Sequence, residues 1–310
     1  MKIPSYQTIS LNTTSPHALY KKAYEYLHAG KLDAGFRLFE YRWHPEVMAN
    51  QGAAYVKPLN IPVWRGEPLM GKSITVVHEQ GFGDIIQYAR FLPALKVLGA
   101  KKVVSLNHDS LHYLLGQISS VDVFTNACEE GTAVESDYWI GAISLPYYIS
   151  LQHPSVKALF PCNLQKIVGS EGYFDAIPSN IPSKIGVNWS TSKGIMHHVR
   201  TMNPHKLADL AGVNAYSLNP ESDEFFFPLP DNGWKTDWSK TAQHIKAMKG
   251  VVTVDTATAH LAGALGVKCI VLMPKDEFKC WRWKHGCWYD SVVAIDEKDY
   301  DQIPDLVRRM

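Results

Sequence analysis

The chain has 310 residues, which at about 150 residues per domain predicts two domains with substantial cores. Hydrophobic residues make up 46% and charged residues 20%, a composition typical of a globular protein, so an intrinsically disordered chain is excluded. Lys plus Arg number 31 and Asp plus Glu number 30, so a net charge of +1 argues against a protein that coats nucleic acid.

The sequence shows no membrane span and no signal peptide, because no apolar run approaches ~18 residues and the N-terminus is polar. Five cysteines, an odd number, indicate no disulfide framework and fit a reducing compartment. We therefore expect a cytoplasmic protein. Cys280, His285 and Cys287 lie close together in the sequence but lack a fourth ligand, so we expect no zinc site.

Residues 15–44 predict a helical hairpin. Ser15 and Pro16 suit the start of a first helix, Gly30 suits its end, and Pro45 is expected to end the second helix. Two short amphipathic helices cannot bury their apolar faces alone, so they pack either on the rest of the chain or on another protein. A linker is expected over 46–70.

From Lys72 onward, short apolar runs alternate with helical patterns, which predicts βαβ units and parallel sheets. The first part has expected strands at 73–78, 102–106, 121–125 and 138–142, and helices from 84 and over 111–118. A proline-rich passage over 150–182 separates it from the second part. The second part has expected strands at 184–188, 216–218, 251–254 and 269–273, and helices over 204–210, 241–248, 258–265 and 300–309. Ligands of such sheets bind beyond the carboxyl ends of the strands.

The first candidate motif, EQGFGD, lies between a strand and a helix. It is not a dinucleotide fingerprint, because Ile86 stands where GxGxxG requires a third glycine. Gly81 and Gly83 allow a ligand to approach the backbone closely. Asp84 is either a helix cap or a general base facing a cleft. Because a helix N-terminus lowers the pKa of a carboxylate, we expect Asp84 to be ionised.

The second candidate motif is VDTATAH, where a buried strand runs into a helix. The small first-turn residues Thr256, Ala257 and Thr258 leave backbone N–H groups uncovered, which predicts an anion site. His260 follows within about a turn and a half and could reach a phosphate or a sugar hydroxyl. The alternative is that Asp255 caps the helix and His260 lies at the edge of the core.

The third candidate motif is NWSTSK, which follows the expected strand KIGVN. The hydroxyls of Ser190 and Thr191, together with Lys193 and Arg200, suit a diphosphate, because charge-assisted hydrogen bonds stabilise a leaving phosphate. A solvated surface loop is the alternative. All three motifs follow strands, so two Rossmann-like halves facing a cleft could bring them together.

The stretch PVWRGEPLMGK running into EQGFGD, together with VDTATAHLAGALG, resembles the TPR-associated glycosyltransferases related to the heptosyltransferases of glycosyltransferase family 9. VNWS, Arg200-Thr201, SLN, Asp237-Trp238, WRW and Trp288-Tyr289 carry the same resemblance. The hairpin, with FEYRW at 39–43, looks like a capping TPR unit, although only one repeat of about 34 residues is present.

The resemblance implies an α/β fold of the GT-B type, with two Rossmann-like domains facing a cleft behind an N-terminal TPR-like helical hairpin. The expected domains are 1–66 for the TPR-like hairpin and linker, 67–165 for the acceptor domain and 166–310 for the nucleotide-sugar domain. It also implies that no metal or other cofactor is required, because the nucleotide sugar is a substrate.

Residue by residue, the resemblance makes Asp84 the catalytic base of an inverting glycosyltransferase. The residues expected to bind the donor are Gly81, Gly83, Ser190, Thr191, Lys193, Arg200, Asp255, Thr256, Ala257, Thr258 and His260. Asn188 and Thr191 depart from the loop expected of a heptosyltransferase, and His197-His198 before Arg200 are unusual. The loop therefore does not fix the donor as ADP-heptose.

The acceptor stays open between a glycan, a protein and a modified nucleobase. Lys275–Trp288 mixes basic residues with tryptophans, which is typical of nucleic-acid tracking, so an enzyme that glycosylates DNA bases is one alternative. The same tryptophans also suit a core. The other alternative is a non-catalytic GT-B scaffold whose helical hairpin binds a protein partner.

Overall fold

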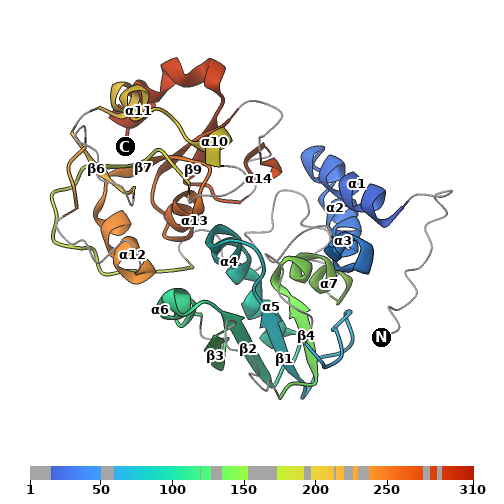
Figure 1. Ribbon diagram of the computed structural model, residues 1–310. Coiled ribbons are helices and arrows are strands. Elements are labelled where there is room, and N and C mark those ends of the chain that lie inside the picture. The colour runs from blue at the N-terminus through green and yellow to red at the C-terminus, as the bar shows by residue number, and fades with distance from the viewer. Residues whose placement is uncertain are drawn as a thin grey trace.

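The fold contains two parallel sheets and a helical hairpin that packs beside both (Figure 1). The computed structural model describes residues 15–49, 59–118, 120–126, 135–152, 173–191, 197–212, 214–219, 226–229, 237–274, 280–284 and 288–310. We call residues 59–152 the first sheet unit, residues 173–310 the second sheet unit and residues 15–44 the hairpin. None of the described helices has the length and apolar character that crossing a bilayer demands.

The first sheet has four parallel strands in the order β3-β2-β1-β4. They are β1 (Ser73–Val77), β2 (Lys102–Asn107), β3 (Val123–Asn126) and β4 (Tyr138–Gly141). β1 pairs with β2 through Ile74 and Val103, and with β4 through Ile74 and Tyr138. The chain winds outward from β1 through β2 to β3, and then returns to the other side of β1 as β4. The residues after β1 therefore lie where the winding reverses, the usual place for a ligand in such sheets.

Helical segments follow β1, β2 and β4. They are α4 (Phe82–Tyr88), η3 (Ala89–Phe91), α5 (Leu92–Val97), η4 (Asp109–Leu111), α6 (His112–Leu115), η5 (Ala142–Ser144) and α7 (Leu145–Gln152). The helix expected from Asp84 begins earlier, at Phe82, with Gly81 as its N-cap. Its buried residues, Ile85, Ile86, Gln87 and Tyr88, hold it against the rest of the fold.

The second sheet has five parallel strands in the order β6-β5-β7-β8-β9. They are β5 (Ile185–Asn188), β6 (Ala215–Ser217), β7 (Gly250–Val254), β8 (Cys269–Leu272) and β9 (Val292–Ile295). The helices are α10 (His197–Arg200), α11 (Pro204–Ala211), α12 (Trp238–Ala247), α13 (Ala257–Ala264), α14 (Trp281–Lys284), η8 (Glu297–Gln302) and α15 (Ile303–Arg308). The sequence did not predict β9, α10 or α14, all of which are four residues long.

Successive side chains along β7 and β8 alternate between two buried faces of the second sheet. Val252 and Ile270 belong to a cluster with α11 and α15, whereas Val251 and Val271 belong to a larger cluster with α12 and α13. The larger cluster also contains residues of the first sheet unit and of the hairpin. One apolar core therefore joins all three parts.

The hairpin consists of α1 (Pro16–His28), α2 (Leu32–Phe39) and η1 (Glu40–Trp43), and α3 (Pro45–Ala49) follows it. The expected caps are confirmed, because Ser15 Oγ accepts a hydrogen bond from the N–H of Ala18 and Gly30 has a φ of 72°. Pro45 differs from expectation, because it begins α3 after the chain has already left η1 at Trp43.

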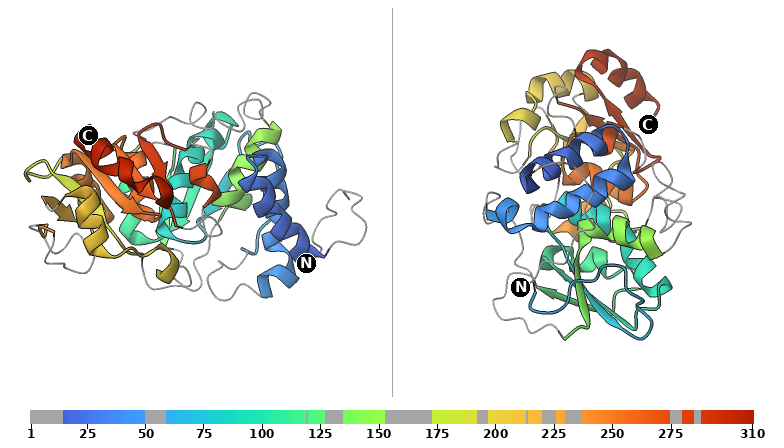
Figure 2. Two further views of the ribbon diagram at one scale, coloured as in Figure 1. Left: turned by 90° about the horizontal axis from the view of Figure 1, so that it is seen from above. Right: turned by 90° about the vertical axis from the view of Figure 1, so that its right-hand side faces the viewer.

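The apolar face of the hairpin packs on the rest of the chain, which settles the open question of its neighbour. The Phe36 ring lies 5.7 Å from Trp281 of the second sheet unit and 6.5 Å from Tyr88 of the first. Figure 2 shows the hairpin running across the zone where the two sheet units meet. The TPR-like character predicted for the hairpin stays a prediction.

A buried ion pair fastens the hairpin to the first sheet unit. The guanidinium of Arg42 donates from Nε and an η nitrogen to the two carboxylate oxygens of Glu79, at 2.8 and 2.7 Å. The same guanidinium also donates to Glu40 at 2.8 Å and to the Ser144 hydroxyl at 2.7 Å. Both side chains of the Arg42–Glu79 pair are fully buried, and Glu79 begins the EQGFGD turn two residues after the end of β1.

Replacing Arg42 tests this anchor. Arg42→Met leaves Glu79 buried without its cation, so the free energy of unfolding is expected to fall by about 3–5 kcal/mol. Chemical denaturation followed by circular dichroism measures the change. Lys22→Met, which breaks an exposed ion pair with Glu25, serves as the control and should leave stability nearly unchanged. Equal effects of the two substitutions would contradict the anchoring role.

Candidate active site

Two of the three candidate motifs meet where the sheet units face each other. The EQGFGD turn follows β1, and the DTATAH segment follows β7. A Cβ atom on Gly83 would lie 3.0 Å from Cδ2 of His260 and 3.3 Å from Cα of Ala257. The start of α4 thus lies directly against the start of α13 (Figure 1), and only a glycine allows this approach.

Asp84 lies at this junction and is not the N-cap residue of α4. Gly81 occupies the N-cap of α4, and Asp84 is the third residue of the helix. Its Oδ1 atom accepts hydrogen bonds from an η nitrogen of Arg282 at 2.8 Å and from Nε2 of Gln87 at 2.9 Å. Arg282 belongs to the second sheet unit, so this ion pair crosses the junction.

The pKa of Asp84 lies above its ordinary value of 3.8, contrary to the prediction from the helix N-terminus. Burial is the main cause, because it penalises the charged carboxylate, and the nearby charge of Asp255 adds to the rise. Arg282, a backbone hydrogen bond with Gly81 and Arg200 oppose the rise without cancelling it. The start of α4 therefore lowers the pKa of Asp84 by less than burial raises it. A carboxylate with a raised pKa is also a stronger proton acceptor once it is ionised.

Asp255 is held in place from two sides and does not cap α13 either. Its Oδ1 accepts a 2.7 Å hydrogen bond from Nε1 of Trp283, and its Oδ2 lies 3.2 Å from an η nitrogen of Arg200. Arg200 also donates to the backbone carbonyl of Asp255 at 3.2 Å. Thr256 is the N-cap of α13 and makes no side-chain capping bond. The buried carboxylate therefore orients Arg200, which is partly exposed, beside the start of α13.

His260 is a buried, neutral imidazole next to this pair. Its ring stacks on Trp283 with centroids 4.7 Å apart, and Nδ1 lies 3.3 Å from the hydroxyl of Tyr289. Burial lowers the pKa of His260 well below 6.5, and the arginines 282, 90 and 200 lower it further. A neutral imidazole can donate or accept a hydrogen bond but brings no charge to a phosphate.

The third motif lies beside the second through Asn188 at the end of β5. The Asn188 amide donates to the hydroxyl of Thr258 at 2.9 Å and, more weakly, to that of Thr256 at 3.4 Å. Ser190 accepts a 2.6 Å hydrogen bond from Asn219. The carbonyl of Thr191 lies 2.8 Å from Nδ1 of His197. These contacts connect the loops after β5, β6 and β7, whereas Lys193 lies outside the described residues.

Three residues that shape this junction were not among the catalytic and donor-binding residues predicted from the sequence. Arg282 and Trp283 bind the two acidic residues, and their signal was the WRW motif, which the resemblance matched without a role. Arg90 is fully buried, donates to the carbonyl of Trp288 at 2.7 Å and lies over the ring of Tyr289 at 4.5 Å. Nothing in the sequence pattern distinguishes Arg90 from a surface arginine.

The tryptophans of this region are buried. Trp281, Trp283 and Trp288 are 3%, 7% and 1% exposed. They therefore offer no free ring faces on which nucleobases could stack, and the core interpretation of these residues is confirmed.

Solved structures share this architecture. The chain matches E. coli ADP-heptose LPS heptosyltransferase II with a TM-score of 0.53 and 12% identity, over 76% of this chain and 96% of that one. The chain has the fold of a heptosyltransferase. A family 9 glycosyltransferase from Veillonella parvula matches with a TM-score of 0.49 and 13% identity, over 80% of this chain and 92% of that one. No family model and no curated protein matches the sequence.

The expectation that proteins with this fold work without a metal is wrong as a general rule. TibC from enterotoxigenic E. coli, described as an iron-containing dodecameric glycosyltransferase, matches with a TM-score of 0.45 and 11% identity, over 66% of this chain and 59% of that one. Within the part of this chain that the structure describes, no three His, Cys, Asp or Glu side chains are grouped to hold a metal ion.

The titration of Asp84 tests the electrostatics of the junction. We expect its carboxyl to titrate above pH 3.8, and Arg282→Gln to move the midpoint further up, because the nearest positive charge is lost. Carbon-detected NMR of the side-chain carboxyls measures both midpoints. Arg308→Gln, an exposed change at the ion pair with Asp305, is the control and should not move the Asp84 midpoint. A midpoint below pH 3.8 in the unchanged protein would show that burial does not raise the pKa of Asp84.

The two glycines of the turn provide a matched pair of substitutions. Gly83→Ala forces α4 and α13 apart and should destabilise the protein by about 1–3 kcal/mol. Gly81→Ala should have little effect, because its added Cβ meets nothing within 4 Å. Thermal unfolding of both variants measures the difference. If the two variants unfold at the same temperature, the close approach of α4 to α13 does not require a glycine at position 83.

Proposed function

We propose that the chain is an inverting glycosyltransferase that moves a sugar from a nucleotide-sugar donor to an acceptor hydroxyl. The observation that supports this most is the Asp84 carboxylate at the junction of the two sheet units, beside the start of α13 and with a raised pKa. The heptosyltransferase fold agrees with this activity. The proposed domains are 1–66 for the TPR-like hairpin and linker, 67–165 for the acceptor and 166–310 for the donor.

In the proposed reaction, ionised Asp84 takes the proton of the acceptor hydroxyl as its oxygen attacks the anomeric carbon. The new carbon–oxygen bond forms as the bond from the anomeric carbon to the diphosphate breaks. The bonding electrons leave with the nucleoside diphosphate, and attack from the opposite face inverts the anomeric centre. Arg282 must release Asp84 for this step, because a carboxylate paired with a guanidinium is a weak base.

The proposed donor site is the start of α13. Backbone N–H groups of the helix start suit the diphosphate, and Ala257 leaves them accessible. Arg200, held by Asp255, contributes the positive charge that stabilises the leaving group. Thr256, Thr258, Ser190 and Thr191 supply hydroxyls from the neighbouring loops. We propose a nucleoside diphosphate sugar, the class to which the ADP-heptose of heptosyltransferase II belongs.

Neither alternative function gains support from the geometry. The tryptophans that suggested DNA binding are buried. A scaffold whose hairpin captures a partner through its apolar face would need that face free, whereas Phe36 packs on Trp281 and Tyr88.

The test separates donor binding from chemistry. Thermal shift against nucleoside diphosphates and their sugars should identify one stabilising nucleotide, worth about 2.7 kcal/mol at 100 times its dissociation constant. Arg200→Ala should abolish this shift. Asp84→Asn should keep the shift yet slow release of nucleoside diphosphate from the nucleotide sugar by about 10²–10⁴-fold.

Two outcomes would contradict the proposal. If no nucleotide stabilises the protein, the donor site is wrong. If Asp84→Asn turns over at the rate of the unchanged protein, Asp84 is not the base. Asp301→Asn, at an exposed position in η8, is the matched control and should change neither readout.

A further inference from the structure

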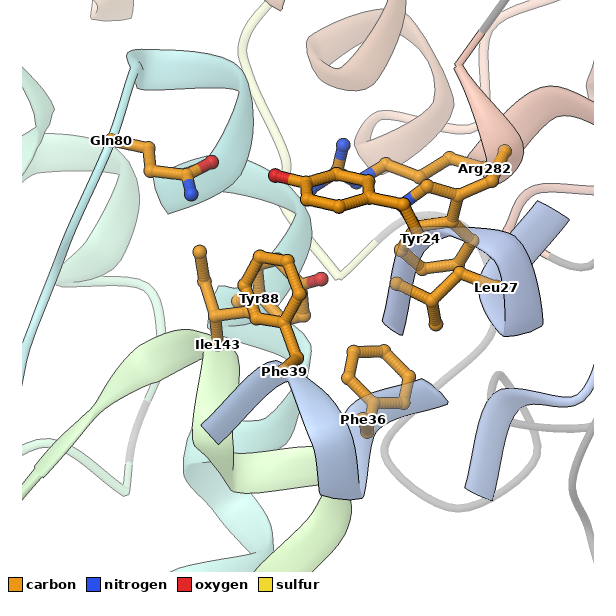
Figure 3. Close-up of a pocket in the computed structure, with 9 residues that line it drawn as sticks. Tyr24, Leu27, Phe36, Phe39, Gln80, Tyr88, Ile143 and Arg282 are labelled. Atoms are coloured by element: carbon orange, nitrogen blue, oxygen red, sulfur yellow. The ribbon is translucent and has the colours of Figure 1, made fainter. Parts of the chain in front are cut away.

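Arg282 lies between two tryptophans that fix the short helix carrying it. α14 has four residues, and Trp281 and Trp283 flank Arg282 within it. Trp283 stacks on His260 of α13, and Trp281 packs on Phe36 of the hairpin. The main chain at Arg282 is therefore held in place, while its side chain extends from α14 toward α4 (Figure 3).

The charge of Arg282 is balanced by the proposed base. Its guanidinium pairs with Oδ1 of Asp84 at 2.8 Å. An η nitrogen also donates to the sulfur of Cys280 at 3.2 Å, and the guanidinium lies beside the Tyr88 hydroxyl. Burial raises the pKa of the Cys280 thiol and of the Tyr88 phenol, so both groups are neutral. Only the ion pair with Asp84 therefore brings a negative charge into contact with Arg282 among the described residues.

Arg282 also lies near the start of α13. Asp84 is adjacent to Gly83, where an added Cβ would lie 3.3 Å from Cα of Ala257, the first residue of α13. The charge of Arg282 also lowers the pKa of His260, which lies one turn further along the same helix. A change of side-chain rotamer can therefore carry the guanidinium from Asp84 toward the proposed diphosphate position while the main chain stays where it is.

Two acidic and two basic side chains form a cluster without net charge at this junction. Asp84 pairs with Arg282, and Asp255 pairs with Arg200 at 3.2 Å. The charges of Asp255 and Arg200 both act on the Asp84 carboxyl, so the two pairs are electrostatic neighbours. A nucleoside diphosphate at the start of α13 would meet two arginines that are already balanced. Its binding is strengthened if one arginine exchanges a carboxylate for the phosphates.

The pair of Asp84 with Arg282 is the one suited to exchange. The Asp255 side chain is 4% exposed, so the loss of its cation would leave a buried carboxylate uncompensated. The side chains of Arg282 and Asp84 are 15% and 18% exposed, so water can reach both. When Arg282 leaves, Asp84 also keeps the hydrogen bond from Nε2 of Gln87.

We propose that Arg282 exchanges partners during the reaction, pairing with Asp84 before the donor binds and with the donor diphosphate afterwards. This inference rests on the proposed glycosyltransferase function and adds a residue to its donor site. Donor binding then uncovers the base, because the guanidinium that held the Asp84 carboxylate moves to the phosphates. Asp84 is free to accept the proton of the acceptor hydroxyl only when Arg282 stabilises the leaving group. The exchange thus couples activation of the base to the presence of the donor.

The first measurement is the affinity for ADP, GDP and UDP, determined by isothermal titration calorimetry at neutral pH. We expect Arg282→Gln to weaken binding of the preferred nucleotide about tenfold, because a charge-assisted hydrogen bond to the diphosphate is lost. Arg282→Lys keeps the charge without the planar fork and should bind with intermediate affinity. Arg308→Gln removes the same charge at an exposed ion pair on α15 and is the control, with unchanged affinity expected.

The second measurement follows the exchange through the pKa of Asp84. Carbon-detected NMR gives the midpoint of its titration with and without the nucleotide. The charge of Arg282 lowers this pKa, so its departure should raise the midpoint when the nucleotide binds. The rise should be smaller in Arg282→Gln, which has already lost that charge. Repulsion by the phosphates alone would raise the midpoint at least as much in the variant, and a merely structural role of Arg282 predicts no larger rise in the unchanged protein.

Two results would overturn the inference. One is that Arg282→Gln binds the nucleotide as tightly as the unchanged protein, and the other is that the nucleotide raises the Asp84 midpoint no more in the unchanged protein than in the variant. In both cases, loss of binding in Arg200→Ala would leave the proposed donor site standing. If ADP, GDP and UDP all fail to bind, the donor site and the exchange are both wrong. Circular dichroism checks that each variant folds, and Arg282→Lys serves for both measurements if Arg282→Gln does not.

Discussion

The ion pair between Arg42 and Glu79 is the constraint on which the junction depends. It lies wholly out of water, where a charge is tolerated only with a well-formed partner, so the hairpin and the β1 strand end cannot separate without a large penalty. The pair fixes the residue immediately before Gln80, and with it the direction in which the EQGFGD turn leaves the sheet. The positions of Gly83 and Asp84 follow from that direction.

A second set of contacts fixes how the two sheet units lie against each other. Gly83 lets α4 approach α13, and the pair of Asp84 with Arg282 crosses the same boundary. Arg90 of the first sheet unit adds a cation that lies over aromatic rings of the second sheet unit. The boundary thus combines apolar packing with a few polar contacts made by acidic and basic side chains. Polar contacts of this kind can exchange one partner for a ligand, which purely apolar packing cannot do.

Much of the fold could be predicted from the sequence. Strongly periodic segments such as 73–77, 251–254 and 257–264 appear as parallel strands and a helix near the expected positions, because burial on both sheet faces leaves a clear apolar run. Of the missed elements, α10, α14 and β9 are four residues long and α3 is five, too short to show a period, whereas α7 is eight residues long. Pro45 could be recognised as a helix boundary from the sequence. The sequence did not show that it begins α3 and does not end the preceding helix.

The candidate site was less predictable, because its chemistry depends on partners far away in the sequence. The motifs identified Asp84, Asp255 and His260, yet the pKa of Asp84 moves in the direction opposite to that expected, since burial by another part of the chain outweighs the helix terminus. Arg42 and Glu79 are separated by 37 positions, and Arg282 and Asp84 by 198. No local sequence pattern predicts such pairs.

The hairpin has the sequence of an appended repeat, but it is part of the folded core. The positive charge of Arg42 is neutralised by Glu79 of the first sheet unit, and the aromatic face around Phe36 is covered by both sheet units. Cutting the chain before Pro45 would leave a buried carboxylate without its counter-ion and uncover Trp281, so the hairpin belongs to the cooperative folding unit and is not a detachable module.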